Sequence, residues 1–430
     1  MFLVSWIFFI RKREQIANSV GFQMKNAYNK KLMEGINQPS LGFLKSPQNN
    51  SVLVNTRGFS AESSFNGSFF SKISMILTKN GVIVQSSIQD FYYPSGGEIS
   101  LDGEWRIHKF NETGTSSFSV PQNMNSNAEY FVVGGGGGGG FSEHYSAGGG
   151  GGGGCLIGNL SLNQGSYPVT VGDGGSGSTS KFSAGTKGGD SSLSSFVAYG
   201  GGGGGSGVPN IYTGDAISPT SGASGGGGGS QIVSRTRNGA LGLSGQGFQG
   251  GNGIGHDSNG DYQSAGGGGG AGSPGGHGST TKGGDGGAGK EYLGLYYCAG
   301  GGGGKRELTG QGGGIGGSGV GGNGGFASAG GHAIPNSGSG GGGAGGLSNA
   351  VGGKGGSGIV FIRYRLYQRL TVSANYSNLS PGSYELQLAA DMDDSSSFNT
   401  LIQFQIVSNT KGHSFSMKHY NVFLLFSIII

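Results

Sequence analysis

The sequence predicts an all-β protein in which short strands form a sandwich-like base that carries a bundle of packed polyglycine II helices. Of the 430 residues, 103 are glycine and only 10 are proline, far from ordinary globular composition. The glycines form unbroken runs directly after short apolar stretches, as in EYFVVGGGGGGG (129–140), SSFVAYGGGGGG (194–205) and LGLYYCAGGGGG (293–304). To this bundle the sequence adds small flanking β-modules and an N-terminal helix.

The N-terminal region, residues 1–100, contains the predicted helix and a hairpin. Apolar residues recur at every fourth position from Ile16 to Ile36, which is helical spacing. Asn80-Gly81 then separates two short apolar runs within residues 74–87, which is the strongest local signal for a β-hairpin. We interpret this region as the attachment segment of the protein.

The glycine-rich domain is expected to span residues 101–366, and glycine dominates it from Gly134 to Gly358. Strands are predicted before and after the glycines, at Trp105–Phe110, Ser116–Val120, Tyr130–Val133 and within Gly355–Leu366. Residues 367–430 alternate apolar and polar side chains, for example at Leu401–Val407, and are predicted to form a small C-terminal β-module.

Three structures compete for the glycine runs. Flexible linkers mix glycine with serine between polar flanks, whereas these runs are pure glycine and begin at strands. Collagen requires glycine at every third position and abundant proline, and neither is present. Packed polyglycine II helices remain: they have three residues per turn and no internal hydrogen bonds, so close neighbours must satisfy their outward backbone groups. We therefore favour an ordered bundle.

Several blocks in order resemble the glycine-rich domain of phage tail-fibre proteins. They are HKFNETGTSSFSVP and AEYFVVGGGGGGG within 108–140, then YPVTVGDGG, SSFVAYGGGGGG, GQGFQGGNG and AGGGGGAG, and finally GGSGIVFIRY at 355–364. The resemblance implies a layered polyglycine II sandwich whose far loops bind a protein or glycan receptor on the host surface. It also implies that other virion or fibre proteins bind the N-terminal region, and that the protein lies on a virion surface or outside the cell.

Counting passes through such a sandwich predicts its distal turns at Phe141–Ala147, Gly207–Ser224, Ile254–Ala265, Lys305–Thr309 and Phe326–Ser337. Charged and aromatic side chains on loops held by a rigid scaffold suit recognition. The candidate receptor-binding residues are Glu143, His144, Tyr145, Tyr212, His256, Asp257, Tyr262, Lys305, Arg306, Glu307 and His332.

No catalytic, metal or cofactor motif is found, so we expect a protein that is not an enzyme. The stretch GDGGAGK (284–290) imitates a phosphate loop, but Glu291 stands where Ser or Thr would bind magnesium. The histidines form no H-x-x-x-H pair, and there is no C-x-x-C. Cys155 and Cys298 each adjoin a glycine run, and two thiols alone leave open whether they pair.

Nucleic acid and membrane are not expected partners. The formal net charge is only +4, and few arginines interrupt the glycines, in contrast to RNA-binding glycine-arginine segments. The apolar stretches at 1–10 and 421–430 would each span about 15 Å as a helix, roughly half a hydrocarbon core, so packing against protein is preferred. The alternative to a receptor-binding protein is a purely structural capsid or extracellular-matrix component.

Overall fold

The computed structural model describes residues 20–24, 49–55, 58–65, 70–90, 92–103, 105–122, 124, 126–207, 217–231, 236–255, 263–306, 311–346, 349–365, 370–377, 382–392, 397–409 and 412–416. Over these residues the protein is essentially all-β, with several antiparallel sheets and no α-helix. The chain divides into two compact units, Tyr93–Arg365 and a unit made of both flanks, Met1–Tyr92 with Leu366–Ile430.

The flanking unit contains two sheets, and each combines strands from both ends of the chain. The first sheet has the order β1-β2-β3-β17 and the second β20-β19-β18-β4-β5. Their strands are β1 (Val20–Met24), β2 (Asn49–Asn55), β3 (Gly58–Phe65), β4 (Phe70–Lys79), β5 (Val82–Asp90), β17 (Leu370–Ser377), β18 (Gly382–Met392), β19 (Ser397–Asn409) and β20 (Gly412–Ser416). The two flanks, treated as separate modules in the sequence, thus share hydrogen-bonded sheets.

Two local predictions in this unit have different outcomes. The Asn80-Gly81 hairpin is confirmed: β4 pairs with β5, and both turn residues have positive φ, 50° and 78°. The N-terminal helix is wrong at Val20–Met24, which form a strand antiparallel to β2. The helical spacing of single apolar residues does not produce a helix here, because Val20–Met24 pair with Asn50–Val54. In short segments, β-propensity and the available strand partners determine the structure. The remainder of Ile16–Ile36 lies outside the described residues.

The glycine-rich unit is built on two sheets and a hairpin. One sheet has the order β10-β9-β16-β7-β6 and the other β13-β12-β11-β8, while β14 pairs with β15. The strands are β6 (Glu98–Asp102), β7 (Trp105–Phe110), β8 (Gly114–Val120), β9 (Ser126–Val133), β10 (Cys155–Leu162), β11 (Gly165–Val171), β12 (Ser191–Leu193), β13 (Phe196–Ala198), β14 (Lys290–Tyr292), β15 (Leu295–Tyr297) and β16 (Ile359–Arg365). The predicted strand at Trp105–Phe110 matches β7 residue for residue.

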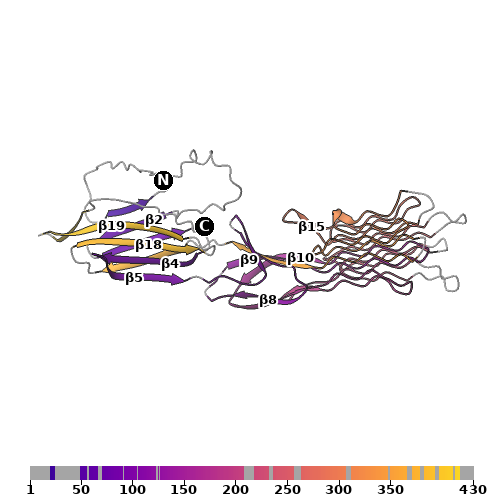
Figure 1. The fold of residues 1–430 in the computed structure, drawn as a ribbon, viewed down its shortest axis with the longest axis horizontal. Coiled ribbons are helices and arrows are strands. Elements are labelled where there is room, and N and C mark those ends of the chain that lie inside the picture. The colour runs from indigo at the N-terminus through magenta and orange to yellow at the C-terminus, as the bar shows by residue number, and fades with distance from the viewer. Residues whose placement is uncertain are drawn as a thin grey trace. The chain divides into compact units, whose positions relative to one another are not determined.

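The strands fix where the glycine segments start. Val133, the last residue of β9, lies opposite both Cys155 of β10 and Ile359 of β16. The segments that begin at Gly134 and end at Gly154 and Gly358 therefore leave the sheet side by side. Figure 1 shows the resulting array of extended traces, which run away from β9, β10 and β15 in near-parallel lines.

The segment Gly134–Gly140 has six neighbours and bonds to each of them with a three-residue period. Gly134, Gly137 and Gly140 donate their N–H groups to carbonyls of one neighbour, at 2.8–3.0 Å. The N–H groups of Gly135 and Gly138 donate to a second neighbour, and those of Gly136 and Gly139 donate to a third. The carbonyls of Gly135–Gly140 accept hydrogen bonds from three further neighbours, again with a three-residue period. The six neighbours are residues 148–154, 184–190, 351–357, 173–178, 200–206 and 338–345. Every backbone polar group of Gly135–Gly139 is thereby satisfied without water.

Such packing leaves no room for a side chain in the inner segments. A Cβ on Gly136, Gly137 or Gly138 would lie 2.0–2.1 Å from the carbonyl oxygen of Ser339, Gly202 or Ser176. The outer segments differ, because every third residue faces solvent. In the segment 351–357, Val351 and Lys354 are exposed and Ser357 is half-buried, while the glycines between them are buried.

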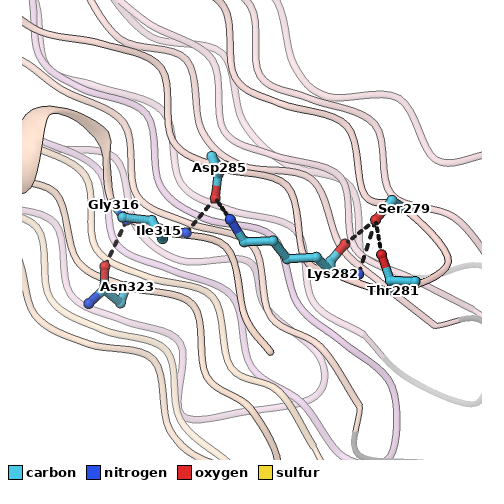
Figure 2. Close-up of polar contacts among 7 residues, drawn as sticks. All are labelled: Ser279, Thr281, Lys282, Asp285, Ile315, Gly316 and Asn323. Atoms are coloured by element: carbon cyan, nitrogen blue, oxygen red, sulfur yellow. Dashed lines mark hydrogen bonds and ion pairs between the residues drawn. The ribbon is translucent and has the colours of Figure 1, made fainter. Parts of the chain in front are cut away.

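Outward polar residues satisfy the backbone of neighbouring outer segments. Figure 2 shows Asp285 Oδ1 accepting the N–H of Ile315 at 2.6 Å, and Asn323 Oδ1 accepting the N–H of Gly316 at 2.8 Å. Asp285 also pairs with Lys282, whose Nζ lies 2.7 Å away. At the surface of the bundle, side-chain oxygens thus take the place of the carbonyls that inner segments supply.

A hydrophobic core joins the strands to the first turns of the bundle. Phe131 stacks near Tyr292, with ring centroids 4.3 Å apart, and packs with Tyr297 and Phe361. Cys155 and Cys298 belong to the same cluster and form a disulfide, which settles the pairing that the sequence left open.

Candidate recognition surface

Figure 1 shows that the glycine segments run to a set of turns on the side remote from the strands, and we call these turns the distal end. Short bridges join its turns: Ser142 pairs with Gly207 and Ala350, and Lys305 pairs with Ser264 and Phe326. The predicted turn at Phe141–Ala147 therefore contacts segments that are distant in sequence, since Ser142 pairs with Ala350. Rigid, hydrogen-bonded segments position these turns, so side chains on them are held in place.

Two of the predicted residues, Tyr145 and Arg306, meet at this end. The Arg306 guanidinium lies 5.9 Å from the centre of the Tyr145 ring, and its Nη1 donates to Gln263 Oε1 at 3.2 Å. Burial raises the pKa of the Tyr145 hydroxyl, and the charge of Arg306 opposes this shift. Tyr145 is buried, so the pair ties two turns together and leaves little of the ring for a ligand.

Beneath the surface of the distal end lies a layer of buried serine and glutamine side chains. Ser146 donates its N–H to Ser230 Oγ at 2.8 Å and its hydroxyl to the Gln263 carbonyl at 2.9 Å. Gln231, 2% exposed, accepts from Arg237 Nε at 2.7 Å. These bonds link turns distant in sequence and fix their spacing.

The distal end includes four partly or fully exposed residues that we call the tip quartet: Glu143 and its sequence neighbour His144, with Lys181 and Phe182. Lys181 Nζ pairs with Glu143 Oε1 at 2.9 Å and also lies 5.4 Å from the centre of the Phe182 ring. Phe182 is 78% exposed, and His144 is exposed too. A half-exposed ion pair contributes little to folding, and an exposed phenyl ring contributes less, so stability does not explain the cluster.

Sequence reasoning missed Lys181 and Phe182. They lie in the stretch GSTSKFSAG (177–185), a turn between two outer segments that the count of passes did not include. A lysine and an aromatic residue together inside a serine- and threonine-rich stretch was the available signal.

The other predicted residues have varied positions. Lys305 is buried, with 1% of its surface exposed. His332 is exposed on an outer segment, where its Nδ1 accepts the N–H of Lys354 at 2.9 Å, and it does not join the quartet. Tyr212, His256, Asp257, Tyr262 and Glu307 lie outside the described residues.

Two of the predicted turns are too long. Within Gly207–Ser224, Thr220 and Ala223 donate to Gly203 and Gly200, so this part runs back along the bundle toward the strands. Within Phe326–Ser337, Ser337 accepts from Cys298 beside β15. Outer segments carry side chains at every third position, and the sequence count took these returning residues for turns.

The described residues give no sign of a metal centre or a membrane span. They contain no group of three His, Cys, Asp or Glu side chains that could hold an ion. No helix in this part of the chain is long and apolar enough to cross a membrane.

Comparison with known families defines the class of protein. The glycine-rich domain family matches residues 111–365, from just before β8 to the end of β16. This match covers more than half of the chain, and the chain belongs to the glycine-rich domain family. No curated protein matches the chain.

Proposed function

We propose that the protein is a non-enzymatic, phage-like surface or tail-fibre protein whose glycine bundle presents its distal end to a host receptor. The observation that carries this proposal is the pairing of a close-packed scaffold with an exposed tip. Gly134–Gly140 is fixed by six neighbours, and in the turn that follows it Glu143, next to His144 in sequence, pairs with Lys181. A rigid scaffold lowers the entropy cost of binding, because the contact residues are already positioned.

We further propose that the glycine segments are polyglycine II helices. The support is their hydrogen bonding. The N–H groups of three successive residues donate to three different segments, and the N–H of the fourth residue donates to the first of these segments again. Three residues per turn and bonds only between chains are the properties of that helix.

The proposed partners and location follow from the same reading. The receptor is a host-surface protein or glycan, and other virion or fibre proteins bind the N-terminal region. The location is a virion surface or outside the cell. The Cys155–Cys298 disulfide supports the location, since such bonds persist mainly in oxidising surroundings.

A structural capsid or matrix protein is the second candidate, and one observation favours it. Tyr145 and Lys305, which the sequence offered as receptor contacts, are both buried in the distal end. In a purely structural protein the tip quartet would have no ligand.

Binding of the full, fluorescently labelled chain to a panel of bacterial strains tests the proposal. On a strain that binds it, we expect serine substitutions at all four residues of the tip quartet to weaken binding at least tenfold. A control with serine at Ile315, Val351 and Lys354, which are exposed on outer segments, should bind as the wild type does. If both variants melt like the wild type and bind equally well, the quartet is no receptor site and the structural candidate gains.

A further inference from the structure

A hollow open to solvent lies near the strand end of the bundle and shares no residue with the tip quartet. There a cavity of about 660 Å³ opens between the segment 241–249, the turn 271–274 and Lys290 at the start of β14. This volume is within the range of small-molecule sites. All three segments belong to the glycine-rich unit.

The walls of the cavity are fixed before any ligand arrives. Gln246 accepts the N–H of Tyr199 at 2.9 Å and donates to the Val197 carbonyl at 3.0 Å, so its amide ties the turn to β13 and the residue after it. Gly247 closes the same turn by donating to Leu243. Ala271, 4% exposed, lines the cavity and also belongs to the core that holds the disulfide. A site with this support loses little entropy when it binds.

The lining combines apolar surface with one charge. Leu241 and Phe248 are 68% and 43% exposed, and Pro274 adds a third apolar side chain. Apolar side chains gathered around a hollow with a single polar group are typical of small-molecule sites. Lys290 is the only charged residue of the lining, and it forms no ion pair with any described residue.

We propose that this cavity binds a small apolar carboxylate, with its hydrocarbon part against Leu241 and Phe248 and its carboxylate on Lys290. Burial of the ligand's hydrocarbon part contributes favourable free energy of binding, in proportion to the apolar area removed from water. The ammonium group of Lys290 favours a negatively charged head group. This inference does not depend on the distal end, and none of the residues of the hollow belongs to the tip quartet.

Calorimetric titration of the full chain with octanoate, octanol and octylammonium tests the proposal. We expect octanoate to bind saturably and octylammonium to bind more weakly than octanol. Lys290→Met keeps the apolar stem and removes the charge. It should raise the Kd for octanoate about fivefold, which is the effect expected of a partly exposed charge pair, and leave the Kd for octanol unchanged. Lys354→Met, on an outer segment, is the matched control and should change nothing.

Leu241→Ser provides a second variant that does not threaten folding, because the side chain is mostly exposed. This variant should weaken the binding of octanoate and of octanol to the same extent. The proposal is overturned if octanoate shows no saturable binding, or if Lys290→Met binds octanoate as tightly as the wild type.

Discussion

Cys155 and Cys298 are joined by a disulfide across 143 residues of sequence, with their Cα atoms 6.4 Å apart. Cys155 starts β10, where the second inner segment ends, and Cys298 follows β15, where a later inner segment begins. The bond therefore joins two glycine segments at the base of the bundle, inside the cluster of Phe131 and Tyr297. The disulfide adds a covalent link at a place where the strands already hold segment ends in register.

The disulfide is predicted to stabilise the glycine-rich unit by about 2–5 kcal/mol, because closing so long a loop restricts the unfolded chain. Cys155→Ala with Cys298→Ala should lower the melting temperature by on the order of 10 °C. Calorimetry of the oxidised protein, the double variant and the wild type in reductant measures this difference. Equal melting of oxidised and reduced wild type would show that the bond does not stabilise the unit.

Close packing of the inner segments predicts a large penalty for a single methyl group. Gly137→Ala would place a Cβ 2.1 Å from the Gly202 oxygen, and backbone on all sides prevents relief. We expect a loss of about 3 kcal/mol, measured by chemical denaturation. Lys354→Ala, on an outer segment, is the control and should cost less than about 0.5 kcal/mol. Similar losses in both variants would contradict the close packing of the inner segments.

His108 predicts a dependence of stability on pH. It is fully buried between Phe118 and Tyr364, its Nδ1 donates to the Gly96 carbonyl at 2.7 Å, and its Nε2 has no partner among the described residues. Burial lowers the pKa of the imidazole from 6.5 to about 4, whereas the Gly96 bond opposes the shift. The folded protein thus binds this proton more weakly than the unfolded chain.

The stability that neutral His108 contributes is therefore complete above pH 6.5 and is lost as the pH falls from 6.5 to 4, by about 3 kcal/mol in total. Denaturation midpoints measured across this range should show the loss in the wild type. They should show a smaller slope in His108→Phe, which cannot titrate. Equal slopes in the wild type and His108→Phe would rule out this role.

The sequence predicted those parts of the fold where local chemistry decides. Trp105–Phe110 is a short run that contains the strand-forming residues Trp, Ile and Phe, and Asn80-Gly81 readily adopts positive φ, so both predictions are confirmed. Val20–Met24 became a strand because of its partner Asn50–Val54, and the apolar spacing contains no information about partners. The same limit applies to Cys155 and Cys298, which only the folded bundle brings together.

The candidate site was predicted in part for a related reason. The turn at Phe141–Ala147 could be found because pure glycine stops there, and it does contribute two residues of the tip quartet. Lys181 and Phe182 follow an outer segment, where glycine is already interrupted by Asp173 and Ser176, so the sequence shows no sharp boundary. Whether an interrupting residue lies in a turn or faces solvent from a segment depends on its neighbours in the bundle.

The outward residues in Figure 2 lead to a last prediction about the surface of the bundle. Asp285 Oδ1 accepts the N–H of Ile315, which has no inner segment to supply a carbonyl. Asp285→Ala should leave that N–H without its partner, at a cost of about 1 kcal/mol, and should speed hydrogen exchange at Ile315. Asp285→Asn retains the acceptor oxygen and loses the charge facing Lys282, so its exchange at Ile315 should stay close to that of the wild type. If the asparagine variant exchanges at Ile315 as fast as the alanine variant, the charge of Asp285 and not its acceptor oxygen protects this N–H.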